Sequence, residues 1–177
     1  MTRLTPHPPG MIPAIAPDGS LYPVEKMAAH RRALRHQAIS VFIFQDGALL
    51  IQQRAVGKYH CPGLWANTVC SHPHWGEDHG PAAERRLWEE LGASLPLHRT
   101  ALINYRADVG QGLVEHEEVV VFKGEAPADF TLAPRAQEVQ ATRWAHPTTL
   151  KAEAIETPER FAPWFRIYLE RWDELGL

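Results

Sequence analysis

The spacing of apolar residues along the chain predicts a layered α/β domain of the α+β kind. A run rich in β-branched and aromatic residues covers 38–44, and Asp46-Gly47 separates it from a second apolar run over 48–53. This pattern predicts a β-hairpin with a type I′-like turn. Further strands are predicted, and they cover 67–72, 102–106, 113–123 and 139–146. Strands broken by a few helices, rather than regular βαβ units, predict a mixed sheet flanked by helices.

Helical spacing is clearest over 81–91. Pro81 stands at the start, Leu87 and Leu91 lie four residues apart on one face, and Gly92 follows at the position that favours a left-handed residue. Shorter signals predict a helix over 25–31 and an amphipathic helix over 163–175.

The chain has room for one sizeable core and not for two ordinary domains. It has 177 residues, of which 45% are hydrophobic and 22% are charged, a balance typical of globular proteins. Prolines at 6, 8, 9, 13 and 17 indicate an extended beginning. We therefore predict a proline-rich N-terminal arm over 1–20 and a single domain over 21–177.

Charge and hydropathy exclude several classes of protein. The net charge of −3 disfavours a nucleic-acid binder, and no apolar run approaches the roughly 18 residues of a membrane span. The first residues lack the apolar segment of a secretion signal, so we expect a cytoplasmic protein without membrane contact. Cys61 and Cys70 could pair, but in that compartment free thiols are favoured.

Glu77 and the run Arg-Arg-Leu-Trp-Glu-Glu-Leu-Gly-Ala over 85–93 are similar to the Nudix box, in which a loop and a helix present carboxylates to a hard divalent ion. Taken alone, Glu89 and Glu90 would indicate only a solvated acidic face. The sequence departs from the box at two positions, since Ser71 replaces the opening glycine and Arg86 replaces a glutamate. A cation at position 86 disfavours pyrophosphate hydrolysis that depends on several metal ions.

Longer motifs resemble one branch of the Nudix superfamily, the type 1 isopentenyl-diphosphate isomerases. The resemblance runs in order from about residue 18 to about residue 172 and is carried by four segments, 25–30, 67–73, 105–117 and 161–164. It implies the interconversion of isopentenyl and dimethylallyl diphosphate with two divalent ions. The expected partner is a small isoprenoid diphosphate, and the expected state is a monomer or weak oligomer.

The resemblance also implies the catalytic residues. Cys70 and Glu117 match the family's acid and base on opposite faces of the substrate, and either residue could act first. Tyr105 matches a tyrosine that assists proton transfer at the glutamate. Trp164 matches a tryptophan whose ring face would stabilise a carbocation.

Two metal sites are expected. Glu115 and Glu117 are two residues apart in a strand-like segment, so both side chains lie on one face, and Cys70 and His72 have the same relation. Each histidine alone would be an ordinary structural residue. The resemblance implies one site with five ligands, which are His30, His36, His72, Glu115 and Glu117. Such a nitrogen-rich set suits Mn²⁺, Zn²⁺ or Fe²⁺ better than Mg²⁺.

The second site would hold Mg²⁺ together with the substrate diphosphate. Its expected protein ligands are Glu90 and the backbone carbonyl of Cys70. The basic residues that match the family's diphosphate contacts are Lys26, Arg54, Lys58 and Arg86. No role is predicted for His60 or His116.

Two other classes of function stay open at this point. A Nudix hydrolase acting on a nucleoside diphosphate derivative is disfavoured by Arg86 and Ser71, and it leaves Cys70 and Glu117 unexplained. A zinc-stabilised module without catalysis is disfavoured by the two carboxylates, because structural zinc usually takes four Cys or His ligands.

Overall fold

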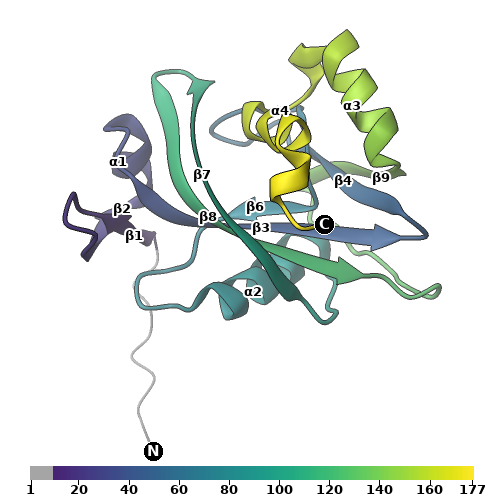
Figure 1. Cartoon of the computed structure of the whole chain (residues 1–177), viewed down its shortest axis with the longest axis horizontal. Coiled ribbons are helices and arrows are strands. Elements are labelled where there is room, and N and C mark those ends of the chain that lie inside the picture. Colours follow the sequence, from purple (N-terminus) through teal and green to yellow (C-terminus); the bar gives the residue numbers. More distant parts are fainter. Residues whose placement is uncertain (1–9) are drawn as a thin grey trace, which may run out of the picture.

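The computed structural model describes residues 10–177, which form one mixed nine-stranded sheet flanked by helices (Figure 1). The strands are β1 Met11–Ile15, β2 Leu21–Glu25, β3 His36–Gln45, β4 Ala48–Arg54, β5 Trp65–Ala66, β6 Val69–Ser71, β7 His98–Gly110, β8 Leu113–Glu125 and β9 Val139–Ala145. The α-helices are α1 Lys26–Arg31, α2 His79–Leu91, α3 Pro147–Glu156 and α4 Pro163–Glu170, with short 3-10 turns at Pro158–Arg160 and Trp172–Glu174. The predicted fold class is confirmed.

Strand β3 organises the sheet. It pairs in parallel with β8 from His36 to Phe44 and antiparallel with β6, β4 and β1. The predicted hairpin joins β3 to β4, and its two turn residues, Asp46 and Gly47, have φ of 50° and 77°. Positive φ at both central positions is what a type I′ turn requires, so the predicted turn is confirmed.

The two faces of the sheet carry separate halves of the core (Figure 1). Along β3, Ile39, Val41 and Ile43 pack with the apolar face of α2, whereas Ala38 and Phe42 pack with α4. This alternation follows from the two-residue period of a strand. The face toward α4 also carries the polar residues His36 and Ser40, both fully buried, and there the functional residues gather.

Helix α2 ends as the sequence predicts. Gly92 adopts φ 61°, and its N–H donates to the carbonyl of Trp88. A Cβ at this position would lie 2.8 Å from both the Cβ and the carbonyl oxygen of Ala133. Gly92 therefore serves both as a left-handed cap and as a point of close approach to the segment after β8.

We expect Gly92→Ala to lower the free energy of unfolding by about 2 kcal/mol or more, because left-handed backbone costs an alanine roughly 1–2 kcal/mol and the clash with Ala133 adds to that. Urea denaturation would measure the change. Gly110→Ala is the matched control, since Gly110 also has positive φ but has open space around it. Equal losses in the two variants would mean that the clash contributes nothing.

Several elements differ from the predictions. The boundary predicted at residue 20 falls in the turn between β1 and β2, and Ala14 of β1 pairs with His36 of β3, so 11–15 belong to the sheet. Residues 1–9 of the predicted arm lie outside the described part. Helix α3 was not predicted. The C-terminal helix ends at Glu170 rather than 175, because Arg171 leaves helical geometry and a 3-10 turn follows.

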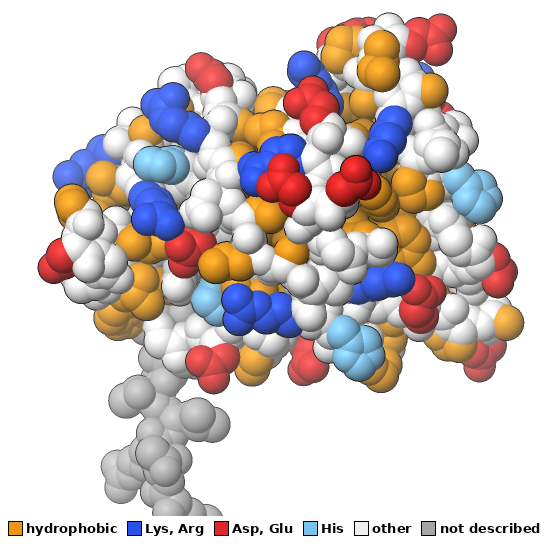
Figure 2. Space-filling view, in the orientation of Figure 1, with side chains coloured by type: hydrophobic (Ala, Val, Ile, Leu, Met, Phe, Trp, Pro, Cys, Tyr) orange, Lys and Arg blue, Asp and Glu red, His pale blue; other side chains and the backbone are white. Residues whose placement is uncertain are grey.

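The distribution of charged side chains on the surface agrees with the net charge of −3. Figure 2 shows basic and acidic side chains interspersed over the face it displays, with no broad patch of one sign. Within 10–177, no helix is both long and apolar enough to cross a membrane.

Candidate functional site

Strand register assembles the site on the α4 face of the sheet. His36 of β3 lies beside Glu117 of β8, and Tyr105 of β7 lies on the other side of Glu117. Ser40 of β3 lies opposite Cys70 of β6. His30 comes from α1, whose first turn is capped by the Glu25 carboxylate accepting from two backbone N–H groups. Residues distant in the chain thus converge at one end of β3.

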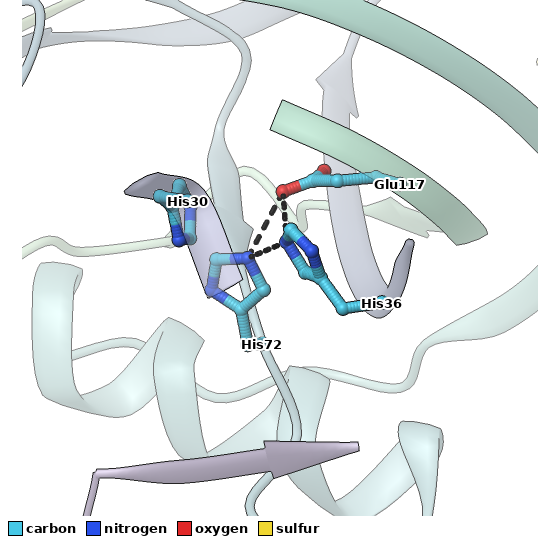
Figure 3. Close-up of side chains that lie close together, drawn as sticks. All are labelled: His30, His36, His72 and Glu117. Carbon is cyan, nitrogen blue, oxygen red and sulfur yellow. Dashed lines mark hydrogen bonds and ion pairs between the residues drawn. The ribbon is translucent and has the colours of Figure 1, made fainter. Parts of the chain in front are cut away.

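Four of the five predicted metal ligands form a tight buried cluster (Figure 3). Nε2 of His72 lies 2.9 Å from Oε1 of Glu117 and 3.2 Å from Nε2 of His36. Nε2 of His36 lies 3.4 Å from the same oxygen. Ligand atoms ~2.1 Å from an ion and at right angles about it lie ~3 Å apart, so this donor set fits a divalent metal.

The imidazole tautomers support the same interpretation. Nδ1 of His30 lies 2.7 Å from the carbonyl oxygen of Lys26, and Nδ1 of His36 lies 2.7 Å from that of Leu34. Each Nδ1–H therefore donates to the backbone and leaves Nε2 with a free lone pair, as is usual for histidines that bind metals. Nε2 of His30 is buried without a hydrogen-bond partner among the described residues. A metal ion would satisfy it.

Glu115 and Glu117 are both buried and share one hydroxyl. Tyr105 Oη lies 2.9 Å from Oε2 of Glu115 and 2.7 Å from Oε2 of Glu117. Burial and the charge of Glu117 raise the pKa of Glu115 well above its usual range. Burial also opposes ionisation of Glu117, but the imidazoles of His36 and His72, which face its Oε1 at 3.4 and 2.9 Å, hold the pKa of Glu117 well below its usual range. Glu117 is therefore the carboxylate that carries the charge.

Cys70 lies nearby in a different environment. Burial, followed by the charge of Glu117, raises the pKa of the Cys70 thiol well above its usual value. Its Sγ lies 3.5 Å from the Ser40 hydroxyl, which in turn lies 2.8 Å from the Tyr168 hydroxyl of α4. The pocket therefore contains a protonated thiol and an ionised carboxylate, an arrangement typical of acid–base chemistry.

Four basic side chains line this pocket. Its wall includes all four predicted diphosphate contacts, Lys26, Arg54, Lys58 and Arg86, together with Cys70, Glu117 and Trp164. Burial and repulsion from Lys58 and Arg86 lower the pKa of Lys26 to about 8. Glu138 balances part of this charge, because it lies 2.5 Å from Lys58 Nζ and 3.4 Å from Arg86. The pocket is suited to a small polyanion.

Helix α2 holds the acidic residues beneath that pocket. Glu90 is buried, and its two oxygens accept from Arg86 at 2.6 Å and from Gln52 at 2.7 Å. Arg85 forms two 2.7 Å hydrogen bonds to Glu77, which ties the preceding loop to the helix. Neither Glu90 nor Tyr105 lines the pocket, but Glu90 contacts Arg86 and Tyr105 contacts the two carboxylates, which do.

The structure adds residues for which the sequence predicted no role. His60 is buried in the pocket wall, where its Nε2 lies 3.4 Å from Glu115. Glu138, Ser40 and Tyr168 also contact predicted site residues. Two of them had a local signal in the sequence: Ser40 lies four residues after His36 on the same face of β3, and His60 lies two residues after Lys58. His116, by contrast, points away from the cluster and lies 3.2 Å from the carbonyl of Ala33.

One domain family matches this chain, and two relatives similar to it in sequence share one name. Residues 34–165 match the NUDIX domain family. The chain is 56% identical over 160 residues to a Cereibacter sphaeroides protein named isopentenyl-diphosphate Delta-isomerase, covering 90% of each chain. It is 51% identical over 162 residues to a protein of the same name from Rhodobacter capsulatus, covering 91% of this chain and 92% of the relative.

Solved structures share the fold at low sequence identity. DR0079 from Deinococcus radiodurans superposes with a TM-score of 0.73 at 16% identity, covering 91% of this chain and 98% of its own. A MutT protein from Methanosarcina mazei gives a TM-score of 0.62 at 19% identity over 78% of this chain and 93% of its own. At these identities the likeness concerns the fold alone.

Proposed function

The chain belongs to the NUDIX family and, within it, to the isopentenyl-diphosphate Delta-isomerases, and from this premise we propose that it interconverts isopentenyl and dimethylallyl diphosphate. The observation that carries the proposal is the pairing of a half-buried thiol, Cys70, with a buried carboxylate, Glu117, in one pocket lined by basic side chains. Pyrophosphate hydrolysis would not require this thiol and carboxylate.

The reaction moves one proton on and one proton off the carbon skeleton. A proton adds to the terminal CH₂ of isopentenyl diphosphate, the cation forms at the branched carbon, and a proton then leaves the CH₂ on its other side. Burial favours the thiol form of Cys70, and the neighbouring imidazoles of His36 and His72 favour the carboxylate form of Glu117. We therefore assign Cys70 as the acid for this direction and Glu117 as the base, with exchanged roles in reverse.

Tyr105 and Trp164 assist these steps. The Tyr105 hydroxyl donates to either carboxylate and so keeps Glu117 oriented. Trp164 is 1% exposed and lines the pocket, where its ring face would stabilise a carbocation by about 0.5–2 kcal/mol and exclude water. The free volume of the pocket is about 20 Å³, room for roughly one water molecule, so substrate entry requires the lining side chains to separate.

Two divalent ions with different roles belong to the proposal, and the buried cluster of His30, His36, His72 and Glu117 supports the first of them. His30, His36, His72, Glu115 and Glu117 would hold Mn²⁺ or Zn²⁺, which would fix the two carboxylates and favour their ionised forms. Glu90 and the carbonyl of Cys70 would hold Mg²⁺, which would neutralise the diphosphate. The identity of each ion stays a prediction, as do the cytoplasmic location and the monomeric or weakly oligomeric state.

The four basic residues would bind the diphosphate. In the structure Glu138 forms ion pairs with Lys58 and Arg86. An incoming diphosphate would compete with the Glu138 carboxylate for these two side chains. The orientation of Arg54 is already fixed in the structure, because its guanidinium lies 5.1 Å from the centroid of the Trp164 ring and donates to the carbonyl of His60. A bound diphosphate would thus lie beside the residue that faces the carbocation.

The proposed function is tested by incubating the protein with isopentenyl diphosphate, Mg²⁺ and Mn²⁺ in D₂O and following the products by NMR. We expect dimethylallyl diphosphate with deuterium in its new methyl group. Release of inorganic phosphate or pyrophosphate without isomer would support a hydrolase instead. Absence of both products, with metal still bound, would support a module without catalysis.

Lys26 predicts a pH dependence of anion binding. Its pKa is lowered to about 8, and a bound anion favours the charged amine, so binding must take up a proton above that pH. The affinity for inorganic pyrophosphate is therefore expected to fall as pH rises from 8 to 9.5. Calorimetric titration would measure it. Lys26→Arg stays charged throughout and should flatten the decline; identical profiles in the two proteins would contradict the assignment.

A further inference from the structure

His60 occupies the boundary between the two halves of the site. It is 3% exposed and comes from the loop between β4 and β5. Its Nδ1 lies 3.2 Å from a terminal nitrogen of Arg54, on the diphosphate side. Its Nε2 lies 3.4 Å from Oε1 of Glu115, on the metal side. No other described histidine of the pocket wall contacts both a basic and an acidic member of the site.

The chemistry of Arg54 fixes the tautomer of this ring. A guanidinium only donates hydrogen bonds, so the His60 Nδ1 that faces it must be the unprotonated acceptor. The proton of the neutral imidazole then sits on Nε2, which points at the Glu115 carboxylate. The opposite tautomer would set two donors against each other at Arg54. Nε2–H of His60 therefore faces Oε1 of Glu115 at 3.4 Å and has no lone pair for a metal ion, although His60 lies with His30 and Glu115 in a group that could otherwise hold one.

Packing holds the ring in this orientation. Its centroid lies 4.3 Å from the Tyr59 ring and 5.4 Å from the Trp164 ring, both edge to face. The carbonyl oxygen of His60 also accepts from Arg54 Nε at 3.2 Å and from its terminal nitrogen at 3.0 Å. One residue thus contacts Arg54 through both its backbone and its side chain.

We infer that His60 is a positioning residue that orients Arg54 for the diphosphate and Glu115 for the metal ion at the same time. The inference rests on the proposed function, which supplies the diphosphate and the metal as ligands. Loss of a hydrogen-bond partner behind a metal ligand typically weakens metal binding 10–100-fold. The two contacts of His60 use different ring nitrogens, so they can be removed one at a time.

Three substitutions separate the contacts. The side-chain oxygen of asparagine can replace the Nδ1 acceptor, and the side-chain NH₂ of glutamine can replace the Nε2–H donor. We expect His60→Asn to keep pyrophosphate affinity and lose metal affinity by about tenfold, and His60→Gln to show the reverse. His60→Ala should lose both. Mn²⁺ affinity would be measured on metal-free protein by the EPR signal of free Mn²⁺, and inorganic pyrophosphate affinity by calorimetry with Mg²⁺ present.

His116→Ala is the matched control, since His116 lies between Glu115 and Glu117 in β8 but points away from the cluster; both affinities should match those of the unaltered protein. Wild-type affinities in all three His60 variants would overturn the inference, as would equal losses in the Asn and Gln variants. A loss of one coordinated nitrogen in the Mn²⁺ EPR spectrum of His60→Gln would overturn it too, in favour of a direct ligand. Failure of the proposed function is distinguishable, because then the unaltered protein would yield no isomer in the NMR experiment.

Discussion

Replacing Cys70 by alanine is expected to lower kcat for isomerisation by about 10³-fold or more, because a positioned acid contributes roughly 10²–10⁴-fold and no other thiol lines the described pocket wall. KM should change little, since the side chain does not bind the diphosphate. Cys70→Ser should also be severely impaired, because a hydroxyl is a much weaker acid than a thiol. Steady-state kinetics with isopentenyl diphosphate would measure both effects.

Cys61→Ala is the matched control for this prediction. Cys61 is also a free thiol and is more deeply buried than Cys70, but its Sγ lies 3.6 Å from the carbonyl of Val109 and outside the pocket wall. Its loss should leave kcat within a few-fold of the unaltered protein. Full activity in Cys70→Ala, with folding verified by circular dichroism, would refute the assigned role.

Replacing Glu117 by glutamine is expected to abolish measurable isomerisation and to weaken metal binding as well. The amide keeps the size of the carboxylate but removes the negative charge that His36 and His72 face at 3.4 and 2.9 Å. It also removes the base. The product is followed by NMR, and bound Mn²⁺ by EPR or elemental analysis after dialysis against a limiting metal concentration.

Glu118→Gln provides the comparison, because Glu118 is the next residue of β8 and points to the other side, where it accepts from Arg35 at 2.7 Å. That variant should retain both activity and metal. If Glu117→Gln binds metal as tightly as the unaltered protein and still isomerises, Glu117 is neither ligand nor base. If Glu117→Gln loses catalysis but not metal affinity, Glu117 is the base and is not a metal ligand.

Elements with strong local signals were predictable from the sequence. The β3–β4 hairpin follows from Asp46-Gly47 between two apolar runs, and α2 follows from its proline start, its apolar face and the cap at Gly92. These signals act within a few residues, so they can be recognised without knowledge of the tertiary contacts. Strands β7 and β8 were recognised but are longer than predicted, because their pairing with each other extends them past the apolar stretches.

Elements that depend on distant partners were not predictable. Strand β1 contains Pro13, which disfavours strands, and it forms because Ala14 pairs with His36 and its apolar residues pack against α1. Helix α3 buries only Leu150, so it carries almost no periodic apolar signal. The ion pair of Arg143 with Glu153 joins α3 to β9 across ten residues. Such contacts exist only after the sheet has formed.

For the candidate functional site, the sequence by itself determined the residue types and which of them share a face. The two-residue period of β8 places Glu115 and Glu117 together, and the family motifs indicate Cys70 as their counterpart. The tertiary structure decided everything that depends on register and orientation. It set His36 beside Glu117, left Nε2 of His30 without a hydrogen-bond partner within residues 10–177, and placed His60 between Arg54 and Glu115. The physical reason is that a period is a local property of the backbone, whereas a tautomer or a register depends on which atoms of distant segments finally come into contact.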